Sequence, residues 1–72
     1  MNVEQMVLKA KEDTKKIFDM MNTCFEKKIE TLHEWFVVNC IIADVLNMKK
    51  DNVSEDMVRS FIEEFNQNVK VK

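Results

Sequence analysis

The stretch WFVVNCIIADVL, residues 35–46, decides the fold of this 72-residue chain. Besides Cys40, nine of its twelve residues are apolar, and no other part of the chain is so uniformly apolar. Buried strands usually run for about four to eight residues between Gly, Pro or other turn residues. This stretch is longer, the chain contains neither Gly nor Pro, and apolar residues continue upstream at helical spacing at Phe25, Ile29, Leu32 and Phe36. We therefore predict a helix rather than a strand.

The predicted helix is apolar on nearly every side. When successive residues are turned by about 100°, Val37 and Ile41 fall among the polar residues. Either flanking helices cover both sides of the helix, or these two residues contact another chain. We favour the second explanation and predict that the helix self-associates as a two-fold dimer. The predicted interface residues are Trp35, Val37, Val38, Ile41, Ile42 and Val45.

An amphipathic helix precedes this stretch, with Asn2 as its expected N-cap. Apolar or small residues recur in alternating steps of four and three, which places them on one helix face. They are Val3, Val7, Ala10, Thr14, Ile17, Met21 and Cys24. Because Thr14 and Lys28 are poor residues for a coiled-coil seam, we predict a bundle helix over residues 3–28.

The end of this first helix is open to three interpretations. Both Thr23-x-x-Glu26 and Thr31-x-x-Glu34 fit a capping box, in which a Thr and a Glu close the first turn of a helix. Without Gly or Pro there is no firm stop signal. We favour a turn near residues 28–31. A break near residues 22–24 and one continuous long helix are the alternatives.

A third helix follows the polar segment NMKKDNVS, residues 47–54. Ser54 is a suitable N-cap, and Val53 and Val58 have the spacing of a hydrophobic staple across it. The sequence therefore predicts one all-α, three-helix domain with helices at about 3–28, 31–48 and 54–67, assembling as a helical-bundle dimer. Residues 68–72 are expected to fray.

The charges are balanced and evenly mixed, with 11 basic and 13 acidic residues and a net charge of −2. The two cysteines, Cys24 and Cys40, are few for a secreted scaffold and lie in apolar stretches, so we expect buried, reduced thiols. The N-terminal residues lack the basic region followed by an apolar core that is typical of a signal peptide, so we do not expect one, and the longest apolar run is too short to cross a membrane. We expect a cytoplasmic protein.

No residue pattern points to catalysis. Glu30 and His33 have the Glu-x-x-His spacing of di-metal carboxylate bundles, but both project from the polar side of their helix. Neither cysteine is accompanied by a Gly-rich or oxyanion-binding loop that would complete a site with His33. We therefore expect no catalytic, cofactor-binding or metal-binding residues.

A helix-turn-helix DNA reader is also disfavoured. The connection before Ser54 is too long for the short turn of that motif, and the would-be recognition helix begins with the acidic residues Glu55 and Asp56. We predict a non-enzymatic regulatory or interaction module that binds another protein through a helical apolar face. A small nucleic-acid-associated regulator, using lysines of the first helix, is the second choice. A di-metal carboxylate enzyme is a remote third.

Overall fold

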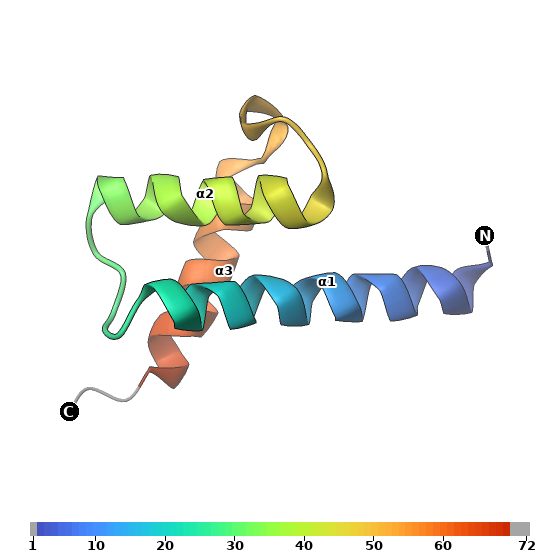
Figure 1. Ribbon diagram of the computed structural model, residues 1–72, viewed down its shortest axis with the longest axis horizontal. Helices are drawn as coiled ribbons and strands as arrows, with labels where there is room; N and C mark the ends of the chain where they lie inside the picture. Colours follow the sequence, from blue (N-terminus) through green and yellow to red (C-terminus); the bar gives the residue numbers. More distant parts are fainter. Residues whose placement is uncertain (1, 70–72) are drawn as a thin grey trace.

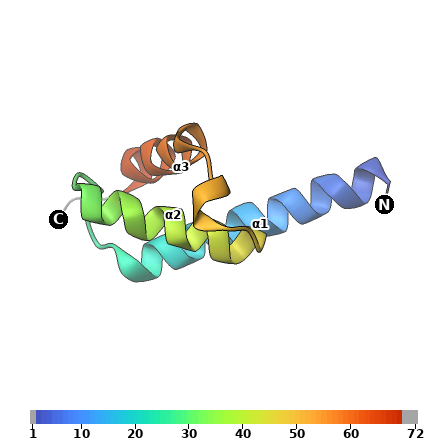
Figure 2. The ribbon, with the colours of Figure 1, turned by 90° about the horizontal axis from the view of Figure 1, so that it is seen from above.

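The computed structural model describes residues 2–69. Within this range the chain forms three α-helices: α1 (Val3–Cys24), α2 (Leu32–Leu46) and α3 (Glu55–Asn68), with a short 3₁₀ turn, η1 (Lys50–Asn52), before α3. No strand occurs in the described range, so the predicted all-α class is confirmed. α2 runs antiparallel to α1, and α3 crosses both (Figure 1). Seen from above, α3 lies to one side of the other two helices (Figure 2).

Each helix begins at the side-chain cap that the sequence predicts. A side-chain oxygen accepts a hydrogen bond from a backbone N–H three residues further on, which satisfies one of the free donors of the first turn. The pairs are Asn2 with Gln5 (2.8 Å), Thr31 with Glu34 (3.2 Å) and Ser54 with Met57 (3.1 Å). At Thr31 the Glu34 carboxylate also accepts from the Thr31 backbone N–H, which completes the capping box.

α1 ends at Cys24, four residues before the predicted end at residue 28. The Thr23 hydroxyl donates to the Asp19 carbonyl (3.0 Å) inside α1 and so does not start a new helix. Phe25 then adopts an extended backbone, and the loop of residues 25–31 leads to Thr31. Ile29, which falls within the predicted turn at residues 28–31, sits in this loop and is only 3% exposed. Because α1 ends at Cys24, Ile29 lies in a loop, and this loop brings its side chain into the core.

α2 ends at Asn47, which takes the left-handed conformation (φ 54°, ψ 52°). The Met48 N–H then donates to the Ala43 carbonyl at 2.9 Å, which closes the last turn of the helix. Asn tolerates this conformation better than other residues with a Cβ. In a chain without Gly, Asn47 therefore serves as the stop signal.

The core lies where the three helices meet and includes two loop residues. Its buried apolar residues are Ile17, Met21, Ile29, Val38, Ile41, Ile42, Ala43, Val53, Val58, Ile62 and Phe65. Two aromatic pairs join α3 to the C-terminal part of α1 and to the loop that follows it: Phe18 with Phe61 (centroids 5.1 Å apart) and Phe25 with Phe65 (6.2 Å). The predicted three-helix domain is therefore confirmed.

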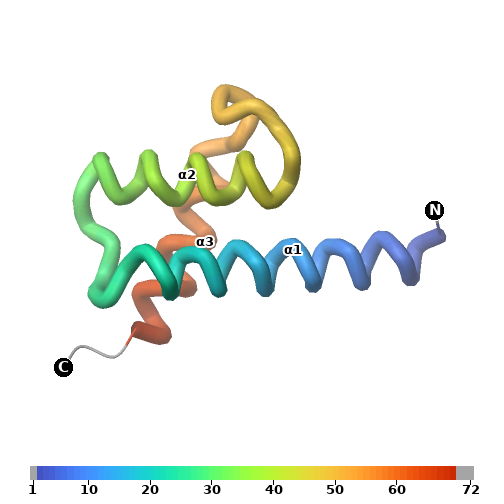
Figure 3. The backbone as a smooth tube through the Cα atoms, in the orientation of Figure 1, coloured from blue at the N-terminus to red at the C-terminus, as the bar shows by residue number. Residues whose placement is uncertain are grey.

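α1 is longer than the bundle that it belongs to. Its 22 residues compare with 15 in α2 and 14 in α3. The N-terminal half of α1 consequently extends past both other helices (Figure 3). The extended shape, 42 × 26 × 19 Å, reflects this projection.

Candidate protein-binding surface

We call residues 3–12 of α1 the arm, because every one of them is exposed. The first buried side chain of α1 is Asp13, and the first buried apolar one is Ile17. An isolated helix of about ten residues is marginal in water. The arm is instead continuous with the packed half of α1, and it is capped by Asn2 and braced by an ion pair from Lys9 to Asp13 (3.4 Å).

The arm carries an apolar stripe in line with the core. Ile17 and Met21, both fully buried, lie on the same face of α1 as Ala10, Val7 and Val3 at steps of four and three. Toward the N-terminus this face loses its cover, so that Val7 is 47% and Val3 74% exposed. We call Val3, Val7, Ala10 and Thr14 the arm stripe; Met6, 56% exposed, lies beside it.

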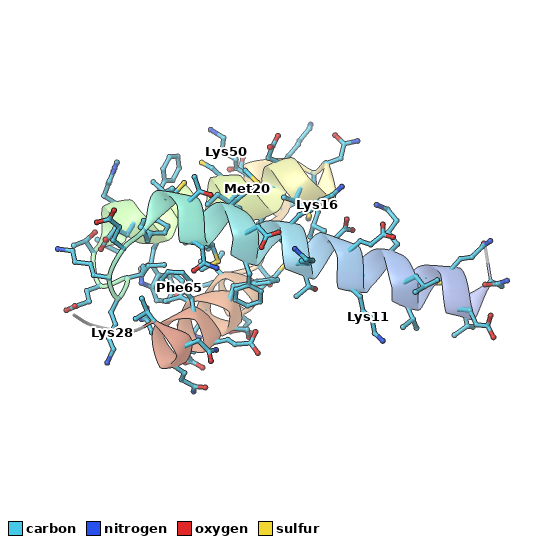
Figure 4. All side chains as sticks on the ribbon, turned by 60° about the horizontal axis from the view of Figure 1, so that its bottom comes forward. Lys11, Lys16, Met20, Lys28, Lys50 and Phe65 are labelled. Carbon is cyan, nitrogen blue, oxygen red and sulfur yellow. The ribbon has the colours of Figure 1, made fainter. Side chains whose placement is uncertain are left out.

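A shallow, mainly apolar groove runs along the arm stripe, lined by Val7, Ala10, Lys11, Thr14 and Lys15. Lys11 and Lys15 form one margin, and Lys15 is bridged to Asp19 at 2.7 Å. Figure 4 shows Lys11 pointing from the arm into open space. Glu4 lies on the same side of the helix, seven residues before Lys11, because seven residues make almost two whole turns. The margin therefore has an acid at its N-terminal end and two bases at its C-terminal end.

The six residues predicted to form an interface lie in or against the core of the chain itself. Val38, Ile41 and Ile42 are buried, with at most 5% of their surface exposed. The other three, Trp35, Val37 and Val45, are partly buried and pack against the same core. Ile41 is buried and Val37 partly buried although both fall among the polar residues of the helix, and α2 is contacted by α1, α3 and η1. Flanking elements thus cover both sides of α2.

A second, smaller apolar patch lies at the start of α2. Leu32 and Phe36 continue the apolar pattern of the predicted helix at helical spacing, but they are 88% and 55% exposed. The apolar pattern therefore extends beyond the part of α2 that the core covers. Phe36 is in part covered by the Lys50 ammonium, 5.4 Å from the ring centroid, in a cation–π contact.

The side chains that could take part in catalysis or metal binding are dispersed over the structure. His33 and Glu30 are both exposed. Cys40 is partly buried, but Cys24 is exposed, which corrects the prediction of two buried thiols; both are free. Across residues 2–69 no three His, Cys, Asp or Glu side chains come together in a group that could hold a metal ion. Among the described helices, none has the length and apolarity that a membrane crossing requires.

Sequence reasoning placed the free apolar surface on the wrong helix, although a signal for the arm was present. The 4-3 stripe of α1 spans 22 residues, and helices of 15 and 14 residues that cross or flank it cannot cover its whole length.

Comparison with known proteins gives no further information on this surface. No protein-family model, curated protein or solved structure matches the chain.

Proposed function

We propose that this chain is a non-enzymatic interaction module that binds another protein through the arm stripe of α1. The observation that carries the proposal is the exposure of Val3 and Val7 on the same face that is fully buried at Ile17 and Met21. A helix face that is buried in the core at one end and exposed to solvent at the other is suited to pack against a second protein with its exposed end.

The spacing of the exposed residues indicates the form of the partner. Val3, Met6, Val7 and Ala10 repeat at steps of three and four, the pattern by which a helix docks onto another helix or into an apolar groove. Full burial of a side chain such as Val or Met contributes roughly 1.5–3 kcal/mol. Two or three such residues therefore support a specific but reversible contact.

The alternative functions have weaker support. A nucleic-acid-associated regulator would use the lysines of α1, but Lys9 and Lys15 are paired with Asp13 and Asp19. A di-metal enzyme would need inward carboxylates around His33, which is exposed. We place the protein in the cytoplasm, where the exposed Cys24 would stay reduced.

The proposal is tested by comparing two charge insertions, one inside and one outside the arm stripe. Val7→Glu puts a carboxylate in the arm stripe, whereas Leu8→Glu puts one about 100° further round the helix, outside the stripe, where Leu8 is already 59% exposed. Neither position belongs to the core, so both variants should keep the helical circular-dichroism spectrum of the natural chain.

In a capture experiment from lysate of the source cells, with quantitative mass spectrometry, Val7→Glu should reduce the recovery of specific partners at least tenfold. Leu8→Glu should leave it nearly unchanged. Equal recovery with both variants would contradict a binding role for the arm stripe. So would the absence of any protein, a second copy included, that binds the natural chain.

A further inference from the structure

We propose that the partner of the arm stripe is a second copy of the same arm, packed antiparallel in a two-fold dimer. This inference rests on the proposed function and names the occupant of that surface. Three properties of the arm support it: the size of its side chains, the order of its charges and the place where the bundle begins.

The side chains of the arm stripe suit close packing of two helices. Val3, Val7, Ala10 and Thr14 are all small or β-branched, so two such faces can approach to the roughly 8 Å separation that small contact residues permit. In the antiparallel arrangement Val7 faces Ala10 of the second copy, and Val3 faces its Thr14. The two-fold axis repeats both contacts, giving four layers of small side chains.

The charges at the margin select the antiparallel direction. In this register Glu4 lies between Lys11 and Lys15 of the second copy, and the two-fold axis forms the same contact a second time. Parallel helices in register would place Lys11 beside Met6 of the other copy and leave Glu4 without a basic neighbour. The order of one acid followed by two bases is therefore complementary to itself only when the helices run in opposite directions.

The start of the bundle limits the overlap to the same length. α3 meets α1 at Phe18, whose ring contacts Phe61. A second α1 that faces Thr14 with its own Val3 begins four residues before Phe18, so we expect the two helices to overlap along residues 3–14 without displacing α3. The exposed length of α1 is therefore close to the length of helix that the proposed antiparallel overlap needs.

The dimer should be reversible. Each copy contributes only the side chains of Val3, Met6 and Val7 and the aliphatic parts of neighbouring side chains. The surface that each copy would bury is on the order of a few hundred Å², compared with about 800 Å² per partner in standard interfaces. We therefore expect dissociation in the micromolar range or weaker. Dimerisation should weaken somewhat as salt is added, because exposed ion pairs are screened.

Disulfide trapping tests both the occupant and the register. In a Cys24→Ser, Cys40→Ser background, two single-cysteine proteins are made, Val7→Cys and Ala10→Cys, and one carries a tag that changes its mass. Under glutathione redox buffer the mixture should form the mixed disulfide at least several-fold faster than either protein forms a disulfide with itself. Circular dichroism checks that the background folds.

Preferred self-linking of the Val7→Cys protein would indicate parallel helices and overturn the inference. Equally slow linking in all three samples would also overturn it. Sedimentation of the natural chain serves as a second measurement if the cysteine-free background does not fold; a monomer at every concentration would exclude the second copy. That result would leave the proposed function standing if Val7→Glu still abolished capture of a different protein.

Discussion

The side-chain amide of Asn66 in α3 closes both backbone hydrogen bonds of Ile29 in the loop between α1 and α2. Its Oδ1 accepts from the Ile29 N–H (2.8 Å), and its Nδ2 donates to the Ile29 carbonyl (3.0 Å). Asn66 thus replaces the backbone partner that Ile29 would have in a helix, while the Ile29 side chain is buried in the core. Asn66 therefore fastens the loop to α3 at Ile29.

We predict that Asn66→Ala lowers the free energy of unfolding by about 1–3 kcal/mol, because it leaves two backbone groups near the core without partners. Asn68→Ala is the matched control, since Asn68 donates to the Glu64 carbonyl in its own helix, at an exposed position. Urea denaturation followed by circular dichroism measures both. Equal midpoints for the two variants would contradict an anchoring role for Asn66.

This contact also shows what the sequence could and could not predict. The caps at Asn2, Thr31 and Ser54 depend on residues only three positions apart, and all three were predictable. Ile29 has helical spacing from Phe25, but it lies in a loop that is held by a hydrogen bond to Asn66, 37 residues away. No local sequence pattern reveals a contact over such a distance. The end of α1 was therefore misplaced.

The candidate surface was missed for a related reason. Periodicity shows which residues of a helix are apolar, but not how far a neighbouring helix reaches along it. Val37 and Ile41 looked surplus because the packing of the neighbouring elements around α2 could not be foreseen. Val3 and Val7 looked like ordinary core residues for the same reason.

Asn47 provides a second test of local structure. Because its φ is 54°, Asn47→Gly should be neutral or stabilising by up to about 1 kcal/mol, whereas Asn47→Val should destabilise by about 1–2 kcal/mol. Thermal unfolding of the two variants beside the natural chain measures the difference. If Val and Gly proved equivalent, the left-handed end of α2 would be refuted.

The capping box at α2 predicts a pH dependence. Hydrogen bonds from the backbone N–H of Glu30 and Thr31, then from the Thr31 hydroxyl, lower the pKa of Glu34 below its ordinary value of 4.5. Since the folded-state pKa is the lower one, the stabilisation is complete above about pH 4.5 and is lost as pH falls through the folded-state pKa.

Glu34→Gln should therefore be less stable than the natural chain at pH 7, and the gap should close as the pH is lowered below 4.5. Unfolding midpoints between pH 7 and pH 3 measure this gap. Glu26→Gln is the control, because Thr23 bonds within α1 and forms no capping box with Glu26. A gap at Glu34 that stayed constant with pH would contradict the assignment.

Hydrogen exchange should divide α1 into two parts. In dilute protein the backbone amides of residues 7–12 should exchange much faster than those of residues 17–24, since only the latter pack against the bundle. Raising the protein concentration should slow exchange in the arm and leave the rest of the chain unchanged. Uniform protection along α1 in dilute protein would mean that the arm is not a separate, uncovered segment.

Charge exchange at the arm margin tests the antiparallel register without cysteines. Glu4→Lys should weaken dimerisation by about three- to tenfold, because it replaces two exposed ion pairs by repulsion. Combining it with Lys11→Glu and Lys15→Glu should restore most of the affinity. Glu12→Lys, a charge reversal on the far side of the helix, should have little effect, and an equal loss there would point to net charge instead.

The most direct test of the arm as a binding surface is sedimentation of the natural chain, Val7→Glu and Leu8→Glu over a wide concentration range. We predict that the average mass of the natural chain rises from 8.6 kDa toward twice that value, and that Leu8→Glu follows it. Val7→Glu should remain monomeric throughout. A natural chain that stays monomeric, or a Leu8→Glu variant as defective as Val7→Glu, would contradict self-association through the arm stripe.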